Sequence, residues 1–80
     1  MNITVLFFGI TTDLVGKTTI SYAIENTTSV KNLKKILIAD YPNLKNIDDF
    51  AIAVNEEYAT NEVLLNNNDV VAIIPPVSGG

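Results

Sequence analysis

The apolar positions of the chain follow two kinds of repeat, one typical of strands and one typical of a helix. Residues 3–8 are apolar or β-branched on both parities, which predicts a central strand. Residues 17–24 alternate apolar and more polar side chains, and the residues 9–16 between the two segments include several that favour turns. We therefore expect these two strands to form a hairpin.

The repeat becomes helical after residue 29. Residues 27–29 offer a hydroxyl N-cap, and the helix should stop near Asp40 because Pro42 disfavours helical geometry at Tyr41. The expected apolar face consists of Val30, Leu33, Ile36 and Leu37, and the expected solvent side carries Lys31, Lys34 and Lys35.

The second half of the chain predicts shorter strands. Residues 50–54 favour a third strand, residues 58–63 a short fourth strand or irregular return, and residues 70–74 a final strand after an asparagine-rich turn at 66–69. This order predicts an α+β fold in which one main helix of about three turns covers one face of a four- to five-stranded sheet.

The composition of the chain argues against several classes of function. The 80 residues suffice for one small domain without a deep cleft, and a net charge of −4 with no basic stripe argues against a nucleic-acid partner. The absence of His and Cys makes catalysis by side chains and a metal site improbable. With no basic leader and no apolar run near the ~20 residues of a membrane span, we expect a cytoplasmic protein without membrane contact.

The C-terminal residues 75–80 favour a stiff arm that leaves the 1–74 domain. Pro75 and Pro76 cannot donate ladder hydrogen bonds and hold polyproline geometry, so the strand should end there. Gly79 and Gly80 carry no Cβ, and could bring an unhindered carboxylate through a narrow channel to an active site. The remaining arm residues are Val77 and Ser78.

Four stretches of the chain carry a family resemblance: Val5-Leu6-Phe7-Phe8, Asp13-Leu14-Val15-Gly16, Ala53-Val54-Asn55 and residues 69–80, which end in Pro-Pro-Val-Ser-Gly-Gly. With these stretches the whole chain resembles the small, sulfur-carrier subunits of molybdopterin synthase, which are ubiquitin-like β-grasp proteins. The chain departs from that family's pattern at Thr12, where an Arg is common, and at Asn67 and Asn68, where Asp-Gly is usual.

The resemblance implies chemistry at the Gly80 carboxylate. A ubiquitin-activating-like adenylyltransferase would use ATP to adenylate it, and sulfur would then replace one oxygen to give a thiocarboxylate. The arm would insert into the large synthase subunit, within a heterotetramer, and donate sulfur to cyclic pyranopterin monophosphate. The chain itself would bind no cofactor and would be the non-catalytic, sulfur-carrying subunit of that sulfurtransferase in molybdenum cofactor biosynthesis.

An apolar surface should accompany the arm. If one helix covers one sheet face, residues of the other parity should be polar, yet Leu6, Phe8 and Ile74 are apolar. The resemblance places partner contacts at Phe8, Tyr58 and Ile74. The competing interpretation is that Phe8 is buried in an ordinary core.

Three alternatives share some of these features. A thiamine-pathway sulfur carrier or a ubiquitin-like protein modifier would use the same activated Gly-Gly end, although Pro75 and Pro76 argue against both. A non-covalent interaction module would bind through the apolar face alone and would never be modified. Incubation with an activating enzyme, ATP and a sulfur donor distinguishes the last of these from a carrier.

Overall fold

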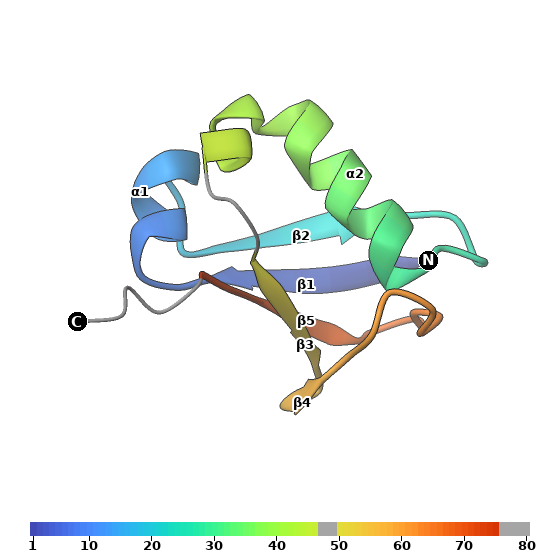
Figure 1. Ribbon diagram of the computed structural model, residues 1–80. Coiled ribbons are helices and arrows are strands. Elements are labelled where there is room, and N and C mark those ends of the chain that lie inside the picture. Colours follow the sequence, from blue (N-terminus) through green and yellow to red (C-terminus); the bar gives the residue numbers. More distant parts are fainter. Residues whose placement is uncertain (47–49, 76–80) are drawn as a thin grey trace.

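A five-stranded mixed sheet with one main helix on one face forms the body of the protein, as the α+β prediction required (Figure 1). The computed structural model describes residues 1–46 and 50–75. The elements are β1 (Asn2–Phe7), α1 (Ile10–Val15), β2 (Thr19–Ala23), α2 (Val30–Asp40), the 3₁₀ helix η1 (Pro42–Asn46), β3 (Ala51–Val54), β4 (Glu57–Tyr58) and β5 (Val70–Ile74).

The strands lie in the order β2-β1-β5-β3-β4. β1 and β2 form the predicted antiparallel hairpin, β1 and β5 pair in parallel, and β3 pairs antiparallel with both β5 and β4. β1 is therefore a central strand, as predicted, and the last strand of the chain lies beside the first. Because β1 and β5 run in the same direction, both end at the same side of the molecule.

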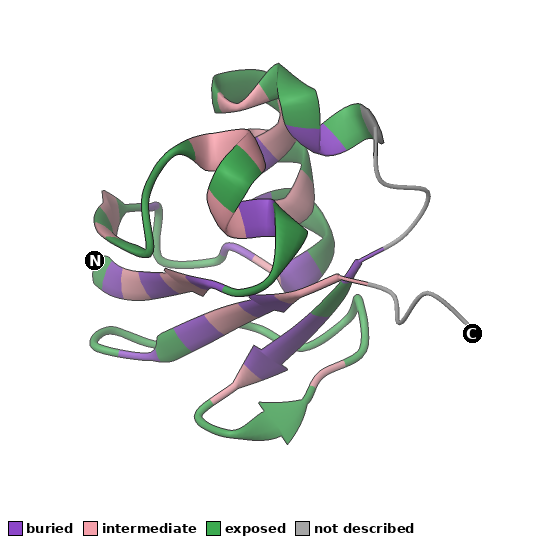
Figure 2. Cartoon of the chain, turned by 90° about the vertical axis from the view of Figure 1, so that its left-hand side faces the viewer, coloured by how far each residue is buried: buried purple, intermediate pink, exposed green. Residues whose placement is uncertain are grey.

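The core lies between the sheet and α2 (Figure 2). Every second residue of β1 points into it, and Ile3, Val5 and Phe7 are buried. From the other side α2 contributes Val30, Leu33 and Leu37, all fully buried. Burial of a large aliphatic side chain contributes about 1.5–3 kcal/mol, so this alternation ties the hairpin and the helix into one unit.

Helix α2 has the boundaries that its sequence predicts. The Ser29 hydroxyl accepts a hydrogen bond from the Asn32 amide at 3.2 Å, and the helix ends at Asp40, just before Pro42. Lys31 and Lys35 are exposed as expected. Lys34 is half-buried, with its ammonium 5.7 Å from the ring centroid of Phe50, which is a cation–π distance.

The segment between the first two strands differs from the prediction. Residues 9–16 were expected to form a turn, but Ile10–Val15 form the short helix α1. Gly9, with φ 57° and ψ −135°, turns the chain into the helix, and Gly16 closes it in the left-handed conformation with its amide donating to the Thr12 carbonyl. Its threonines and aspartate have modest helix propensity, so the local sequence alone gave a weak helical signal.

The second hairpin is short and tightly turned. β4 has only two residues and begins at Glu57, one residue before the predicted range 58–63, and the chain then leaves the sheet as the irregular return that the sequence allowed. Asn55 and Glu56 form the loop, both with positive φ, and Asn68 adopts the same conformation in the predicted turn before β5. Among residues 1–46 and 50–75, the helices are too short or too polar to cross a bilayer.

Candidate functional site: the open sheet face and the end of β5

The sheet face opposite α2 carries a continuous row of apolar side chains. The pairing places Leu6 opposite Ala72, Ala72 opposite Ala53, and Ala53 opposite Tyr58, so one line crosses four strands from β1 to β4. Directly opposed residues of a sheet point to the same side. These side chains therefore lie on the face that no helix of the described chain covers (Figure 1).

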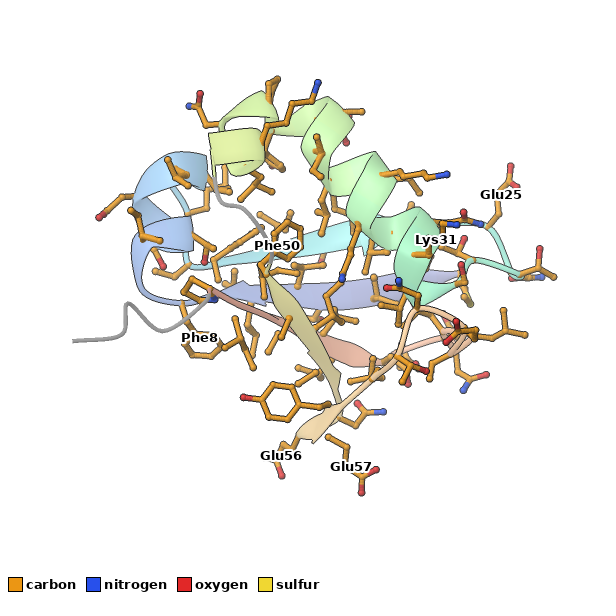
Figure 3. The ribbon with its side chains drawn as sticks, in the orientation of Figure 1. Phe8, Glu25, Lys31, Phe50, Glu56 and Glu57 are labelled. Carbon is orange, nitrogen blue, oxygen red and sulfur yellow. The ribbon has the colours of Figure 1, made fainter. Side chains whose placement is uncertain are left out.

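Phe8 and Ile74 extend this face toward the end of β5. Phe8 follows β1 with the parity of Leu6, and its side chain lies on the side of the sheet away from α2 (Figure 3). Half of its surface is exposed, so the interpretation of a buried Phe8 is wrong. Ile74 is half-buried and pairs with Ala51, so it lies next to the Leu6–Tyr58 row.

Tyr58 marks the other end of the face and is 76% exposed. Between Tyr58 and the bulky pair of Leu6 and Phe8 lie two small residues, the buried Ala53 and the half-buried Ala72. A partner that contacted this face could therefore anchor aromatic or aliphatic groups between large apolar side chains, the arrangement found at the centres of protein interfaces.

The position of Phe8 is fixed by the first turn of α1. The buried Thr11 hydroxyl accepts a hydrogen bond from the Phe8 amide at 2.9 Å and donates to the Phe8 carbonyl. Thr12 donates from its hydroxyl to the Phe7 carbonyl at 3.1 Å. These bonds satisfy backbone groups that the sheet leaves free where β1 ends. The role of Thr11 was not predicted from the sequence, because α1 itself was not predicted.

The end of β5 lies beside this junction. A Cβ added to Gly9 would stand 3.3 Å from Cγ of Pro75, so the Pro75 ring packs closely over Gly9 and would have to shift slightly to admit a side chain there. Pro75 is half-buried, and here the predicted arm begins. The other predicted arm residues, Pro76, Val77, Ser78, Gly79 and Gly80, lie outside the described residues.

An acidic tip borders the face next to Tyr58. Glu56 and Glu57 are exposed and point away from the body of the protein (Figure 3). Behind them the buried Asp69 accepts hydrogen bonds from the Asn55 side chain at 2.9 Å and from the Asn66 amide at 2.7 Å. The described residues contain no group of three or more metal-ligating side chains. The tip is thus a solvated turn held by Asp69.

Comparison with known proteins agrees with this geometry. Residues 5–80 match the ThiS family. A molybdopterin synthase sulfur carrier subunit from Caenorhabditis briggsae is 35% identical over 83 residues, which cover 100% of this chain and 99% of the relative.

Solved structures share the fold. SAMP1 from Haloferax volcanii superposes with a TM-score of 0.87 at 21% identity, with complete coverage of both chains. A complex of subunits 1 and 2 of molybdopterin-converting factor from Helicobacter pylori contains a chain with a TM-score of 0.70 and 28% identity, again with complete coverage of both.

Proposed function

Since this chain belongs to the ThiS family, we propose that it is the sulfur carrier of a molybdopterin synthase and holds the sulfur as a thiocarboxylate on Gly80. The proposal has support from the likeness to curated sulfur carrier subunits along the full length of the chain. The site itself, the Gly80 carboxylate, is a prediction from the sequence.

One structural observation carries the proposal. β5 belongs to the open apolar face through Ala72 and Ile74, and it leads directly into Pro75. A protein that binds the face would therefore also lie next to Pro75, where the predicted arm begins. A carrier needs this arrangement, because its reacting end must enter the active site of another protein while its folded body is held outside.

The carrier chemistry takes place in two balanced steps. The Gly80 carboxylate attacks the α-phosphorus of ATP, releasing pyrophosphate and forming an acyl adenylate. A sulfide-level donor then attacks the acyl carbon, AMP leaves, and a thiocarboxylate remains. A carboxylate is a poor electrophile, so the adenylate supplies the leaving group that makes the second step possible. ATP is consumed in the activating enzyme, and this chain contributes only its end.

The proposed partners follow from the same scheme. A ubiquitin-activating-like adenylyltransferase would load the carrier, and the large subunit of molybdopterin synthase would unload it onto cyclic pyranopterin monophosphate. The Helicobacter pylori structure is a complex of subunits 1 and 2 of molybdopterin-converting factor, which supports a large-subunit partner for this chain. In the proposed assembly Phe8, Tyr58 and Ile74 contact the large subunit, two carriers and two large subunits form a heterotetramer, and the location is cytoplasmic.

The proposal is tested by intact mass. The protein is incubated with the activating enzyme, ATP and sulfide, and the expected product is heavier by about 16 Da, the difference between sulfur and oxygen. The matched control lacks Gly80, keeps the folded body, and should stay unmodified. Modification of the truncated control, or an unmodified full chain under conditions that load an established carrier, would contradict the proposal.

A second experiment separates the possible acceptors. The loaded carrier is mixed with the candidate large subunit and cyclic pyranopterin monophosphate, and molybdopterin formation is followed. Product formation supports the assignment. A carrier that loads with sulfur but is consumed only by thiazole synthesis, or that becomes linked to lysines of other proteins, would instead be the thiamine-pathway or modifier alternative. A chain that never loads would be an interaction module.

A further inference from the structure

The two edge strands of the sheet differ in how well they are protected against pairing with a further strand. Sheet edges expose unpaired backbone groups, and proteins usually shorten an edge strand, charge it, bulge it or cover it. The β4 edge has only two residues, one of them Glu57. The β2 edge, Thr19–Ala23, has five residues without a charge, a proline or a break in its pairing with β1. The β2 edge is thus open to a further strand.

The hydrogen bonds show which groups of β2 are available. The Phe7 amide donates to the Thr18 carbonyl and the Ile24 amide donates to the Met1 carbonyl. In an antiparallel pair such positions alternate, so the backbone groups of Thr19, Ser21 and Ala23 point away from β1. All three residues are exposed. They offer the repeating donors and acceptors that an added strand requires.

A groove lies beside this edge, between the end of β2 and α2. It has a volume of about 560 Å³ and is lined by Ala23, Ile24, Glu25, Thr28, Asn32, Lys35 and Ile36. Asn32, Lys35 and Ile36 form one face of α2, since residues three and four apart lie together on a helix. Side chains of an added strand that point to the helix side of the sheet would enter this groove.

The charges around the groove indicate what kind of segment fits. Lys35 lines the groove, and Lys31 precedes it by one turn on the same flank of α2, whereas Glu25 is the only acidic residue of the lining. The buried Ile24 and half-buried Ile36 supply the apolar part. We propose that the β2 edge and this groove bind an extended segment of a partner protein, in which β-branched apolar residues are flanked by carboxylates.

Such binding would leave the sulfur-carrying end free. β2 runs antiparallel to β1 and β5, so β2 ends at the end of the molecule opposite to the end of β5 (Figure 1). Ala23, the last residue of β2, lines the groove. Glu25, at the rim of the groove, lies far from Phe8 (Figure 3). A partner held here could keep the carrier near its loading or unloading enzyme while the open face and the chain after Pro75 are engaged elsewhere.

The test uses a capped peptide, acetyl-Asp-Val-Ile-Val-Asp-amide, added to the ¹⁵N-labelled full chain while amide signals are followed by NMR. We expect saturable shifts at Thr19, Ser21 and Ala23. A peptide with lysine in place of both aspartates should bind about two- to fivefold more weakly, as expected for the loss of an exposed ion pair. No saturable shift at millimolar peptide, or shifts confined to Leu6, Ala53 and Ala72, would overturn the proposal.

Two variants localise the binding. Lys35→Glu should weaken the acidic peptide about fivefold or more, whereas Lys45→Glu, the same charge change on η1 outside the groove, should leave it unchanged. Equal effects of the two would contradict the assignment. Ser21→Pro removes one outward amide at an edge position that tolerates proline, and should also weaken binding. If it does not fold, the lysine pair decides alone.

The unliganded protein supplies the remaining control. Concentration-dependent dimerisation through β2 in the absence of peptide would show that a second copy occupies the edge, and would overturn the proposal. None of these results depends on Gly80, since a chain that accepts sulfur but ignores the peptide loses only this inference.

Discussion

The ring of Pro75 packs over Gly9, close enough that a Cβ at Gly9 would stand 3.3 Å from the Pro75 Cγ. Gly9 joins β1 to α1 and follows Phe8 of the open face, whereas Pro75 follows β5. This contact joins the two chain segments where the parallel strands end. Gly9 therefore helps to hold Pro75, the last residue that the structure describes, in place after β5.

Gly9→Ala should lower the free energy of unfolding by about 1–3 kcal/mol, because an L-residue at φ 57° and ψ −135° is strained and its methyl group would press on Pro75. Gly16→Ala is the matched control, since Gly16 also has a positive φ but nothing lies within 4 Å of its added Cβ. Urea unfolding should show the larger loss for Gly9→Ala. Equal losses would mean that the contact with Pro75 contributes nothing.

Phe8→Ala should weaken binding to the proposed large subunit by about tenfold or more, as expected when an aromatic side chain that a partner buries is removed. Phe8 is half exposed, so the same change should alter stability by less than about 1 kcal/mol. Ile10→Ala is the control, because Ile10 is similarly exposed but belongs to α1. Calorimetric titration measures both variants. If Phe8→Ala bound as tightly as Ile10→Ala, the open face would not be the interface.

The sequence predicted the layers of this fold because burial leaves a direct pattern. Ile3, Val5 and Phe7 are buried on one parity of β1, and Leu6 and Phe8 are apolar on the other, so the uncovered face could be inferred before its neighbours were known. The order of the strands could not be inferred in this way. The parallel pairing of Val5 with Val71 joins residues far apart in the chain, and no local pattern specifies it.

The helix α1 is the element that the local sequence pattern did not predict. Its N-cap, Gly9, makes no side-chain capping bond, so the usual sequence sign of a helix start is missing. The Thr11 hydroxyl accepts a hydrogen bond from the Phe8 amide, and this contact cannot be recognised from the sequence. The one usable signal was Gly16, a left-handed C-cap directly after Leu14 and Val15. Of the candidate site, Phe8 and Ile74 were assigned to the open face by strand parity, whereas Tyr58 was included only through the family resemblance. The structure places Tyr58 on this face through its pairing with Ala53, and the partner contacts of all three residues remain a prediction.

Asp69→Ala should cost about 1–3 kcal/mol of stability. The buried carboxylate accepts from the Asn55 side chain and the Asn66 amide, and its removal leaves both donors without that partner. Asn67→Ala removes a single bond to the Asn2 amide in an exposed position and should change stability by about 0.5 kcal/mol or less. Thermal unfolding of the two variants should therefore differ clearly, and similar midpoints would contradict a structural role for Asp69.

Glu56→Gly should raise the free energy of unfolding by about 0.5–1 kcal/mol. Asn55 and Glu56, both with positive φ, form the two-residue loop between the paired residues Val54 and Glu57, which is the geometry of a type I′ turn. That turn favours Asn-Gly, so Glu56 at φ 73° is strained where glycine would not be.

Glu57→Gly provides the control with the same change of charge. Glu57 lies in β4, where a glycine would lose more conformational entropy on folding and would relieve no strain. The free energy of unfolding of this variant should therefore fall by about 0.5–1 kcal/mol. Chemical denaturation of both variants in one buffer measures the difference. We expect Glu56→Gly to stabilise the protein and Glu57→Gly to destabilise it, because the two neighbouring glutamates differ in backbone conformation. Equal destabilisation by both would show that Glu56 is not strained by its left-handed conformation.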